Sequence, residues 1–183
     1  MMTIGIIYGG TREGNTEMLA HYAVQELAAE KIYLRDYSIH SIVDQRHILG
    51  GFQNIGDDYN SIIDRILQHD ILIFVTPIYW YSMSGTMKNF IDRWSQSLRD
   101  TNYSNFKASM SAKKAFVIAV GGDNPYVKGL PLIQQFQHIF DFMGMSFDGY
   151  VLGEGNKPGD IRQDEAAILA AQQLNNKLKA YEG

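Results

Sequence analysis

A glycine-rich loop near the N-terminus has residue types that could bind a phosphate group. Residues 9–16 read G-G-T-R-E-G-N-T, which matches the Walker spacing G-x-x-x-x-G-K-[ST] except that Asn15 replaces the lysine. Without that lysine a nucleoside triphosphate loses the main cation for its β- and γ-phosphates. Backbone N–H groups, hydroxyls and a helix dipole can still hold one phosphate monoester. The side chains that could assist them are Thr11, Arg12, Asn15 and Thr16.

The same loop also has a purely structural interpretation. A glycine turn followed by an ordinary Thr or Asn helix cap would have a similar sequence. The pattern G-x-G-x-x-G is absent, so the loop does not support a dinucleotide-binding fingerprint of the pyrophosphate type.

A second segment could provide a wall for a planar ring. Residues 76–94 read T-P-I-Y-W-Y-S-M-S-G-T-M-K-N-F-I-D-R-W. Three aromatic residues in succession, Tyr79, Trp80 and Tyr81, offer a flat apolar surface directly after an apolar run. Alternatively, these aromatics fill gaps beneath a loop, and Pro77 only ends a strand.

A third segment, residues 121–126, reads G-G-D-N-P-Y. Because glycine lacks a Cβ atom, this backbone could come close to a ligand, although a simple turn would explain the local sequence equally well. The combination of a phosphate-type, an aromatic and a glycine-rich loop favours a ligand site, provided that the three loops lie at one edge of the fold.

The elements between these loops alternate between strand and helix. Apolar runs that end in glycine or proline are typical of strands buried on both faces of a sheet, and apolar residues spaced three and four apart predict helices. Asn15 or Thr16 could cap the first helix and Asp57 or Asp58 the second. Strands are predicted at 3–8, 31–36, 71–76, 115–120 and 147–152, and helices at 16–27, 59–67, 85–98, 132–143 and 164–181.

This alternation predicts an α/β fold with right-handed crossovers onto one parallel sheet and helices on both faces. Five strands favour a flavodoxin-like three-layer sandwich with a five-stranded parallel sheet of order 2-1-3-4-5. A ligand then lies outside the carboxyl ends of the strands, where the strand order reverses. The three loops all follow strands at that edge.

Composition and charge narrow the class of protein. The chain has 183 residues, 45% of them apolar and 20% charged, which suits one domain over residues 1–183. With 16 basic and 20 acidic residues the net charge is −4, so we expect no nucleic-acid partner. The longest apolar run, residues 71–75, is too short to cross a membrane, and the N-terminus lacks a basic signal region. We therefore expect a cytoplasmic protein without membrane insertion.

The chain contains no cysteine, which excludes a disulfide, a thiol nucleophile and a cysteine-ligated metal or cluster within it. His40 and His47 lie in a segment without clear periodicity, residues 37–56, and we interpret them as solvated side chains. We expect no metal site.

Taken together, the loops resemble the NAD(P)H-dependent FMN reductases of the flavodoxin-like superfamily, especially the branch of NAD(P)H:quinone oxidoreductase-like proteins and iron–sulfur flavoproteins. The matching motifs are G-x-T-R-x-G-N-T, D-D-x-x-x-I-I, the P-I-Y-W to K-N-F-I-D-R-W block and the later glycine pair, which together cover nearly the whole chain. The iron–sulfur members carry a cysteine cluster before the D-D pair, and residues 40–56 have none. No iron–sulfur cluster is therefore inferred.

The resemblance implies a single FMN-binding domain and three groups of site residues. The FMN phosphate would be held by Thr11, Arg12, Gly14, Asn15 and Thr16. The isoalloxazine and ribityl groups would contact Pro77, Ile78, Tyr79 and Trp80. The other side of the ring would face Gly121, Gly122 and Asp123.

The resemblance also implies a reaction. NAD(P)H would deliver hydride to FMN, and the reduced flavin would reduce a small-molecule acceptor such as a quinone, a nitro or azo compound, a metal ion or a free flavin. The flavin carries this chemistry, so no side chain is assigned as catalytic. Two alternatives remain: a flavodoxin-type electron carrier without pyridine-nucleotide activity, and a flavin-binding sensor.

The family typically builds its flavin site near a subunit boundary, which implies a homodimer or homotetramer. Phe90, Ile91, Trp94 and Leu98 offer more apolar surface than one buried stripe requires, and we expect them near that boundary. The alternative is that all four pack inward within one monomer.

Overall fold

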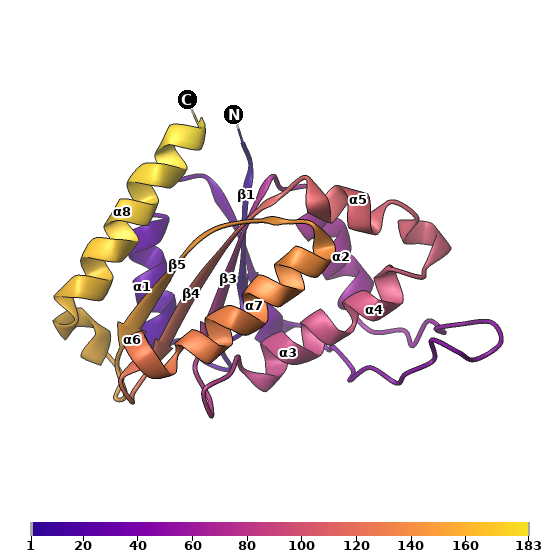
Figure 1. The fold of residues 1–183 in the computed structure, drawn as a ribbon, viewed down its shortest axis with the longest axis horizontal. Helices are drawn as coiled ribbons and strands as arrows, with labels where there is room; N and C mark the ends of the chain where they lie inside the picture. The colour runs from indigo at the N-terminus through magenta and orange to yellow at the C-terminus, as the bar shows by residue number, and fades with distance from the viewer. Residues whose placement is uncertain (1, 183) are drawn as a thin grey trace.

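One parallel sheet organises the molecule, which a computed structural model describes over residues 2–182 (Figure 1). Its strand order is β2-β1-β3-β4-β5, which confirms the predicted order. The strands are β1 (Ile4–Tyr8), β2 (Ala29–Tyr33), β3 (Ile71–Pro77), β4 (Lys114–Gly121) and β5 (Ser146–Glu154). The order reverses between β1 and β3, so loops leaving the carboxyl ends of these strands diverge and leave room for a ligand.

Helices cover both faces of this sheet. One face lies against α1 (Asn15–Ala23) and α8 (Glu165–Glu182), whose buried residues pack with one side of the strands. The helices whose residues pack on the other face are α2 (Tyr59–Leu67), α3 (Gly85–Asp92), α4 (Trp94–Ser97), α5 (Phe106–Ser111) and α7 (Leu130–Met143). The short α6 (Pro125–Lys128) follows β4 at the carboxyl edge. Figure 1 shows these layers.

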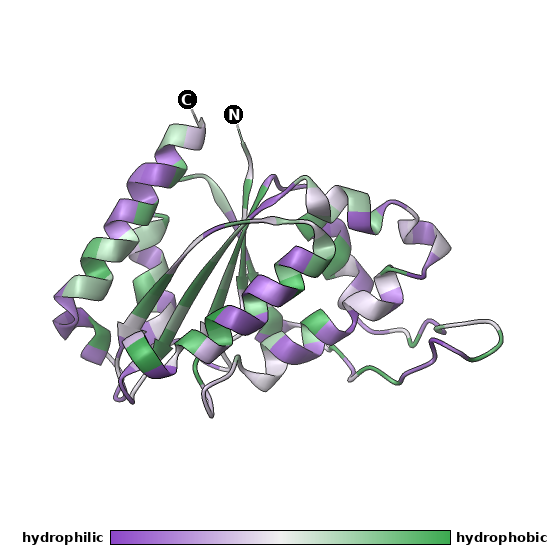
Figure 2. Ribbon diagram, viewed as in Figure 1, coloured by the Kyte–Doolittle hydropathy of each residue, from purple (hydrophilic) through white to green (hydrophobic). Residues whose placement is uncertain are grey.

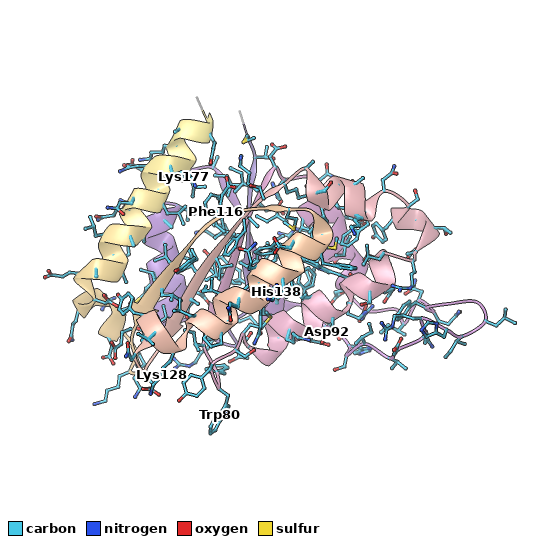
Figure 3. The ribbon with its side chains drawn as sticks, viewed as in Figure 1. Trp80, Asp92, Phe116, Lys128, His138 and Lys177 are labelled. Atoms are coloured by element: carbon cyan, nitrogen blue, oxygen red, sulfur yellow. The ribbon has the colours of Figure 1, made fainter. Side chains whose placement is uncertain are left out.

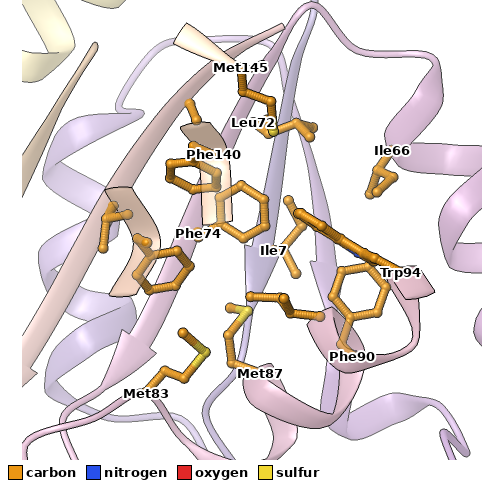
Figure 4. Packing of buried hydrophobic residues seen from close by; sticks show 14 of the residues in the cluster. Ile7, Ile66, Leu72, Phe74, Met83, Met87, Phe90, Trp94, Phe140 and Met145 are labelled. Carbon is orange, nitrogen blue, oxygen red and sulfur yellow. The ribbon is translucent and has the colours of Figure 1, made fainter. Parts of the chain in front are cut away.

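The central strands are apolar on both faces, as expected for a covered parallel sheet. Every residue of β1 is buried, and Figure 2 shows the strands as the most hydrophobic part of the molecule. On the α7 side the core contains a group of packed aromatic rings: those of Phe74 and Phe140 lie 5.2 Å apart, and Trp94 meets Phe90 edge to face at 6.2 Å (Figure 4). This side therefore supports the sheet under the predicted ligand edge.

Several predicted boundaries are wrong. The second strand is β2 at Ala29–Tyr33, and residues Leu34–Asp36 form a 3₁₀ turn instead of continuing it. The helix predicted at 85–98 is divided into α3 and α4 at Arg93. Further 3₁₀ turns lie at Thr101–Tyr103 and Asp160–Gln163. These differences lie at element ends, where pattern carries least information.

The predicted aspartate cap of α2 is wrong for Asp58, whereas Asp57 Oδ1 does accept from the N–H of Tyr59, the first residue of the helix, at 3.3 Å. Asp58 precedes the helix without a side-chain cap, and its carboxylate instead accepts from the Ser38 N–H at 2.7 Å. Asp57 lies 2.6 Å from the Arg93 guanidinium in an ion pair whose side chains are 4% and 2% exposed. The same guanidinium donates to the His40 carbonyl and lies 4.4 Å over the Tyr59 ring. The D-D and K-N-F-I-D-R-W motifs thus meet in a buried pair that ties the long loop to the helices.

The four apolar residues expected at a subunit boundary pack inward. Phe90, Ile91 and Trp94 are buried in the core of one chain, and Leu98 packs against the same cluster. The expectation that they present surplus apolar surface to a partner is therefore wrong, and these residues give no support to the predicted assembly. Within residues 2–182, no helix is both long and apolar enough to span a membrane.

Candidate functional site

A cavity of about 220 Å³ lies at the carboxyl edge of the sheet. All three predicted loops contribute to its walls. The predicted residues that line it are Thr11, Arg12, Gly14, Asn15, Thr16, Pro77, Ile78, Tyr79, Gly121 and Gly122. Trp80 and Asp123 line a smaller adjoining cavity instead, and the two cavities share Ile78, Gly121 and Gly122.

One end of the large cavity suits a phosphate. The helix α1 begins at Asn15 directly after the extended Gly14, and the N–H groups of its first turn have no intrahelical carbonyl to bond. Together with the positive end of the helix dipole, they form the type of site that holds an anion. Arg12 adds an exposed guanidinium, and the buried Thr16 adds a hydroxyl.

An acidic residue at this end is neutralised within the protein. Glu17 lies in the first turn of α1 and lines the cavity, where its charge would repel a phosphate. Arg35 forms an ion pair with it, and the hydrogen bond to Glu17 raises the pKa of the Arg35 guanidinium. Arg35 also lies 4.5 Å over the Tyr33 ring at the end of β2. The field at the helix start therefore remains favourable to an anion.

The predicted cap role of Asn15 or Thr16 is wrong, because α1 has no side-chain cap and Asn15 is its first residue. The Asn15 amide instead bonds the loop that follows β5. Its Nδ2 donates to the Lys157 carbonyl at 2.8 Å, and its Oδ1 accepts from the Gly159 N–H at 2.8 Å.

The loop after β5 is a part of the site that the sequence analysis missed. Gly155 and Asn156 both line the large cavity. Two signals could have found this loop: the turn-forming sequence G-E-G-N-K-P-G-D at 153–160, and the rule that all carboxyl ends of a parallel sheet share one edge.

The aromatic segment forms a tight turn at the cavity mouth. Tyr79 and Ser82 exchange two backbone hydrogen bonds of 3.0 and 3.1 Å, with Trp80 and Tyr81 at the tip. Both tip residues have positive φ, 49° and 62°, a combination that usually selects Asn-Gly and strains other residues. Trp80 is 94% exposed and projects from the molecule in Figure 3. Trp80 therefore does not fill a gap beneath a loop.

Three polar side chains line the smaller cavity beside this turn. The Tyr81 hydroxyl donates to Asp123 at 2.9 Å, and the Lys128 ammonium donates to both Asp123 oxygens at 2.7 and 2.8 Å. The hydrogen bond from Lys128, then that from Tyr81, lowers the pKa of Asp123, and the bond to Asp123 raises that of Lys128. Both groups therefore stay charged across neutral pH.

Close contacts join the loops at this edge in pairs. Ser84 Oγ donates to the Gly9 carbonyl at 2.6 Å and accepts from the Met87 N–H at 3.1 Å, so it joins the first loop to the start of α3. A Cβ atom on Gly122 would lie 2.9 Å from Cβ of Asn156, so only glycine allows the loops after β4 and β5 to meet so closely. The arrangement brings the start of α1 and the first residue of the aromatic turn, Tyr79, to a single cavity.

Comparison with known proteins identifies similar chains. A family model described as NADPH-dependent FMN reductase matches residues 2–152. A Bacillus subtilis protein, named as an NAD(P)H-dependent FMN-containing oxidoreductase, is 65% identical over 180 residues, which cover 98% of this chain and 99% of the relative. An iron–sulfur flavoprotein of Archaeoglobus fulgidus is 30% identical over 107 residues, 56% of this chain and 53% of its own.

Among solved structures, the Trp repressor binding protein from Bacillus subtilis has a TM-score of 0.81 and 59% identity to this chain. The match covers 94% of this chain and 97% of that one. The likeness extends across the sheet and its helices and agrees with the flavodoxin-like order described above.

Proposed function

The chain belongs to the NADPH-dependent FMN reductase family, and on that premise we propose that it takes hydride from NAD(P)H through bound FMN and passes the electrons to a small aromatic acceptor. It is thus an FMN-dependent oxidoreductase. The acceptor classes that suit this chemistry are quinones, nitro and azo compounds, and free flavins. The observation that carries the proposal is the single cavity lined by the first turn of α1 and by Tyr79 of the aromatic turn.

The residues present fit FMN at the phosphate end. The N–H groups at the start of α1, with Thr11, Arg12 and Thr16, would hold the phosphate, as the resemblance implies. The arrangement suits one phosphate better than a triphosphate, because Asn15 replaces the Walker lysine and its amide is already bonded to the β5 loop.

At the other end, Pro77, Ile78, Tyr79 and the Gly121–Gly122 pair would hold the ring. When bound, FMN supplies the redox chemistry, accepting a hydride and returning two electrons. Trp80 and Asp123 line the adjoining cavity, where the nicotinamide and the acceptor would take turns. In this scheme the side chains bind and orient the flavin and its substrates and exclude water. No side chain is assigned a proton transfer.

The test is a spectrum of the purified protein followed by anaerobic addition of NADH or NADPH. We expect an oxidised-flavin band that bleaches with at least one nucleotide and returns when a quinone is added. A full flavin band that neither nucleotide bleaches would support the electron carrier or the sensor instead. Protein that binds no flavin would contradict the proposal altogether.

A further inference from the structure

The loop Gly155–Asp160, which we call the β5 loop, forms a wall of the cavity that none of the three predicted loops provides. It leaves the carboxyl end of β5, at the same edge as the other three loops. The Gly155 N–H donates to the Gly121 carbonyl at 3.0 Å, which extends the contact between β4 and β5 beyond the sheet. Gly155 and Asn156 thereby reach the cavity.

Internal and external hydrogen bonds fix the shape of the β5 loop. Asp160 Oδ2 accepts from the N–H groups of Asn156 and Lys157, at 3.2 and 2.7 Å. Gly159 adopts φ of +91°, a conformation that favours glycine. The two bonds to Asn15 then attach this loop to the start of α1. A Cβ atom on Gly155 would lie 2.8 Å from the Asn15 amide, so glycine is required for this approach.

Asn156 lies between the two ends of the cavity. The carbonyl of the next residue, Lys157, accepts from Asn15 at the phosphate end. The Cβ atom of Asn156 itself lies close to Gly122 at the ring end. The side chain is exposed, and within residues 2–182 its amide has no hydrogen-bond partner. One acceptor and two donors are therefore available where the chain between a phosphate and a ring must pass.

We infer that the β5 loop is a fourth wall of the cofactor site, in which the Asn156 amide hydrogen-bonds the ribityl hydroxyls, and that Asn15 is the positioning residue that holds this wall. The inference rests on the proposed function, because it takes FMN as the occupant. It assigns Asn15 a role different from direct phosphate binding. The two roles predict different results with riboflavin, which has the ribityl chain but no phosphate.

The experiment measures dissociation constants of FMN and riboflavin for the apoprotein by quenching of flavin fluorescence. Asn156→Ala should weaken both flavins by a similar factor, about 3- to 10-fold, the range for one neutral hydrogen bond. Asn15→Ala should also weaken both, and hydrogen exchange of the Gly159 N–H should accelerate because its acceptor is lost. Asn102→Ala, an exposed asparagine in the Thr101–Tyr103 turn, is the matched control and should change neither constant.

Three outcomes would overturn the inference. Unchanged affinities in Asn156→Ala, with normal flavin binding by the wild type, would refute the ribityl contact and leave the proposed function standing. An Asn15→Ala protein that loses affinity for FMN and keeps it for riboflavin would show that Asn15 acts on the phosphate directly. A wild-type protein that binds neither flavin would remove the proposed function and this inference with it.

Discussion

Arg12 offers the most direct test of the phosphate end. Its exposed guanidinium lines the cavity beside the start of α1. Since a hydrogen bond to a charged group contributes about 1.5–3 kcal/mol, Arg12→Ala should weaken FMN roughly 10- to 100-fold and riboflavin little. Calorimetric titration of the apoprotein measures both. An equal loss for the two flavins, or a collapse of the thermal melt by circular dichroism, would favour a structural role for this loop.

Arg35 should affect the same binding from a greater distance. It neutralises Glu17, which lies in the first turn of α1 and lines the cavity. In Arg35→Ala the Glu17 carboxylate would repel the phosphate, and we expect FMN affinity to fall by roughly 5- to 30-fold, a loss of about 1–2 kcal/mol. Riboflavin serves as the uncharged comparison in the same titration.

The double variant Arg35→Ala, Glu17→Gln removes both charges and should recover most of the FMN affinity. If it binds as weakly as the single variant, Arg35 acts through packing against Tyr33 instead of through charge.

At the scale of single residues, the sequence predicted which segments line the cavity better than what each side chain bonds. Asn15 fits a phosphate motif and a helix cap equally well, yet its partners Lys157 and Gly159 lie at the opposite end of the chain. No local spacing encodes a contact across that separation. The roles of the predicted FMN-contacting residues remain predictions.

Among the elements, the turn at Trp80 and Tyr81 stores backbone strain. Trp80 has φ of 49° and is 94% exposed, so replacing it removes little packing. Asparagine tolerates this left-handed conformation, and Trp80→Asn should raise the free energy of unfolding by about 1 kcal/mol. Urea denaturation measures the change.

The control for this turn is Trp80→Ala, which removes the indole but does not tolerate positive φ. We expect it to leave stability near that of the wild type. A Trp80→Asn protein no more stable than Trp80→Ala would show that the turn is not strained at this residue.

The buried ion pair between Asp57 and Arg93 should make stability depend on pH. Burial alone would raise the pKa of Asp57, but hydrogen bonds from Arg93 and from the His40 N–H lower it below its usual value. A carboxylate whose pKa is lower in the folded state stabilises that state fully at pH values above its unfolded pKa, about 3.9. This stabilisation is lost as the pH falls through the folded-state pKa.

Asp57→Asn leaves a buried guanidinium unpaired and should cost about 3–5 kcal/mol of unfolding free energy at neutral pH. The difference from the wild type should shrink as the pH falls below about 4, because the unfolded carboxylate then gains a proton, and it should vanish once the pH is also below the lowered folded pKa. Urea denaturation at several pH values measures it. Asp44→Asn, which breaks the exposed pair with Arg46, should leave stability unchanged, and a constant cost for Asp57→Asn at every pH would contradict the assignment.

The elements show why patterns predicted some boundaries and not others. The strands β1, β3 and β4 are buried on both faces, so their apolar runs are unmistakable. The edge strand β2 is half-buried and carries Glu30 and Lys31, so its pattern is weak and the prediction was displaced. The ion pair of Asp57 was not predicted, because its partner Arg93 lies far along the chain.

For the whole molecule, topology predicted more than any single motif. Buried parallel strands joined by helices allow few arrangements, and the observed order is the one expected. The same rule places every carboxyl-end loop at one edge. It therefore applies to the β5 loop, which the resemblance did not include because its motifs end at the glycine pair after β4.

The state of assembly is the last property that the structure makes testable. The segment between β2 and α2 projects beyond the helices as a long loop (Figure 1), and its side chains Val43, Ile48 and Leu49 are exposed, Leu49 fully at 101%. Apolar side chains on a projecting loop suit contact with a second copy of the chain, and a two-fold dimer is the commonest arrangement.

We expect light scattering at micromolar concentration to give at least twice the 20.7 kDa of one chain. Leu49→Glu should shift the mass toward the monomer, whereas Leu169→Glu, a matched change on the exposed side of α8, should not. A wild-type mass of one chain, with flavin bound and turnover intact, would contradict the predicted assembly.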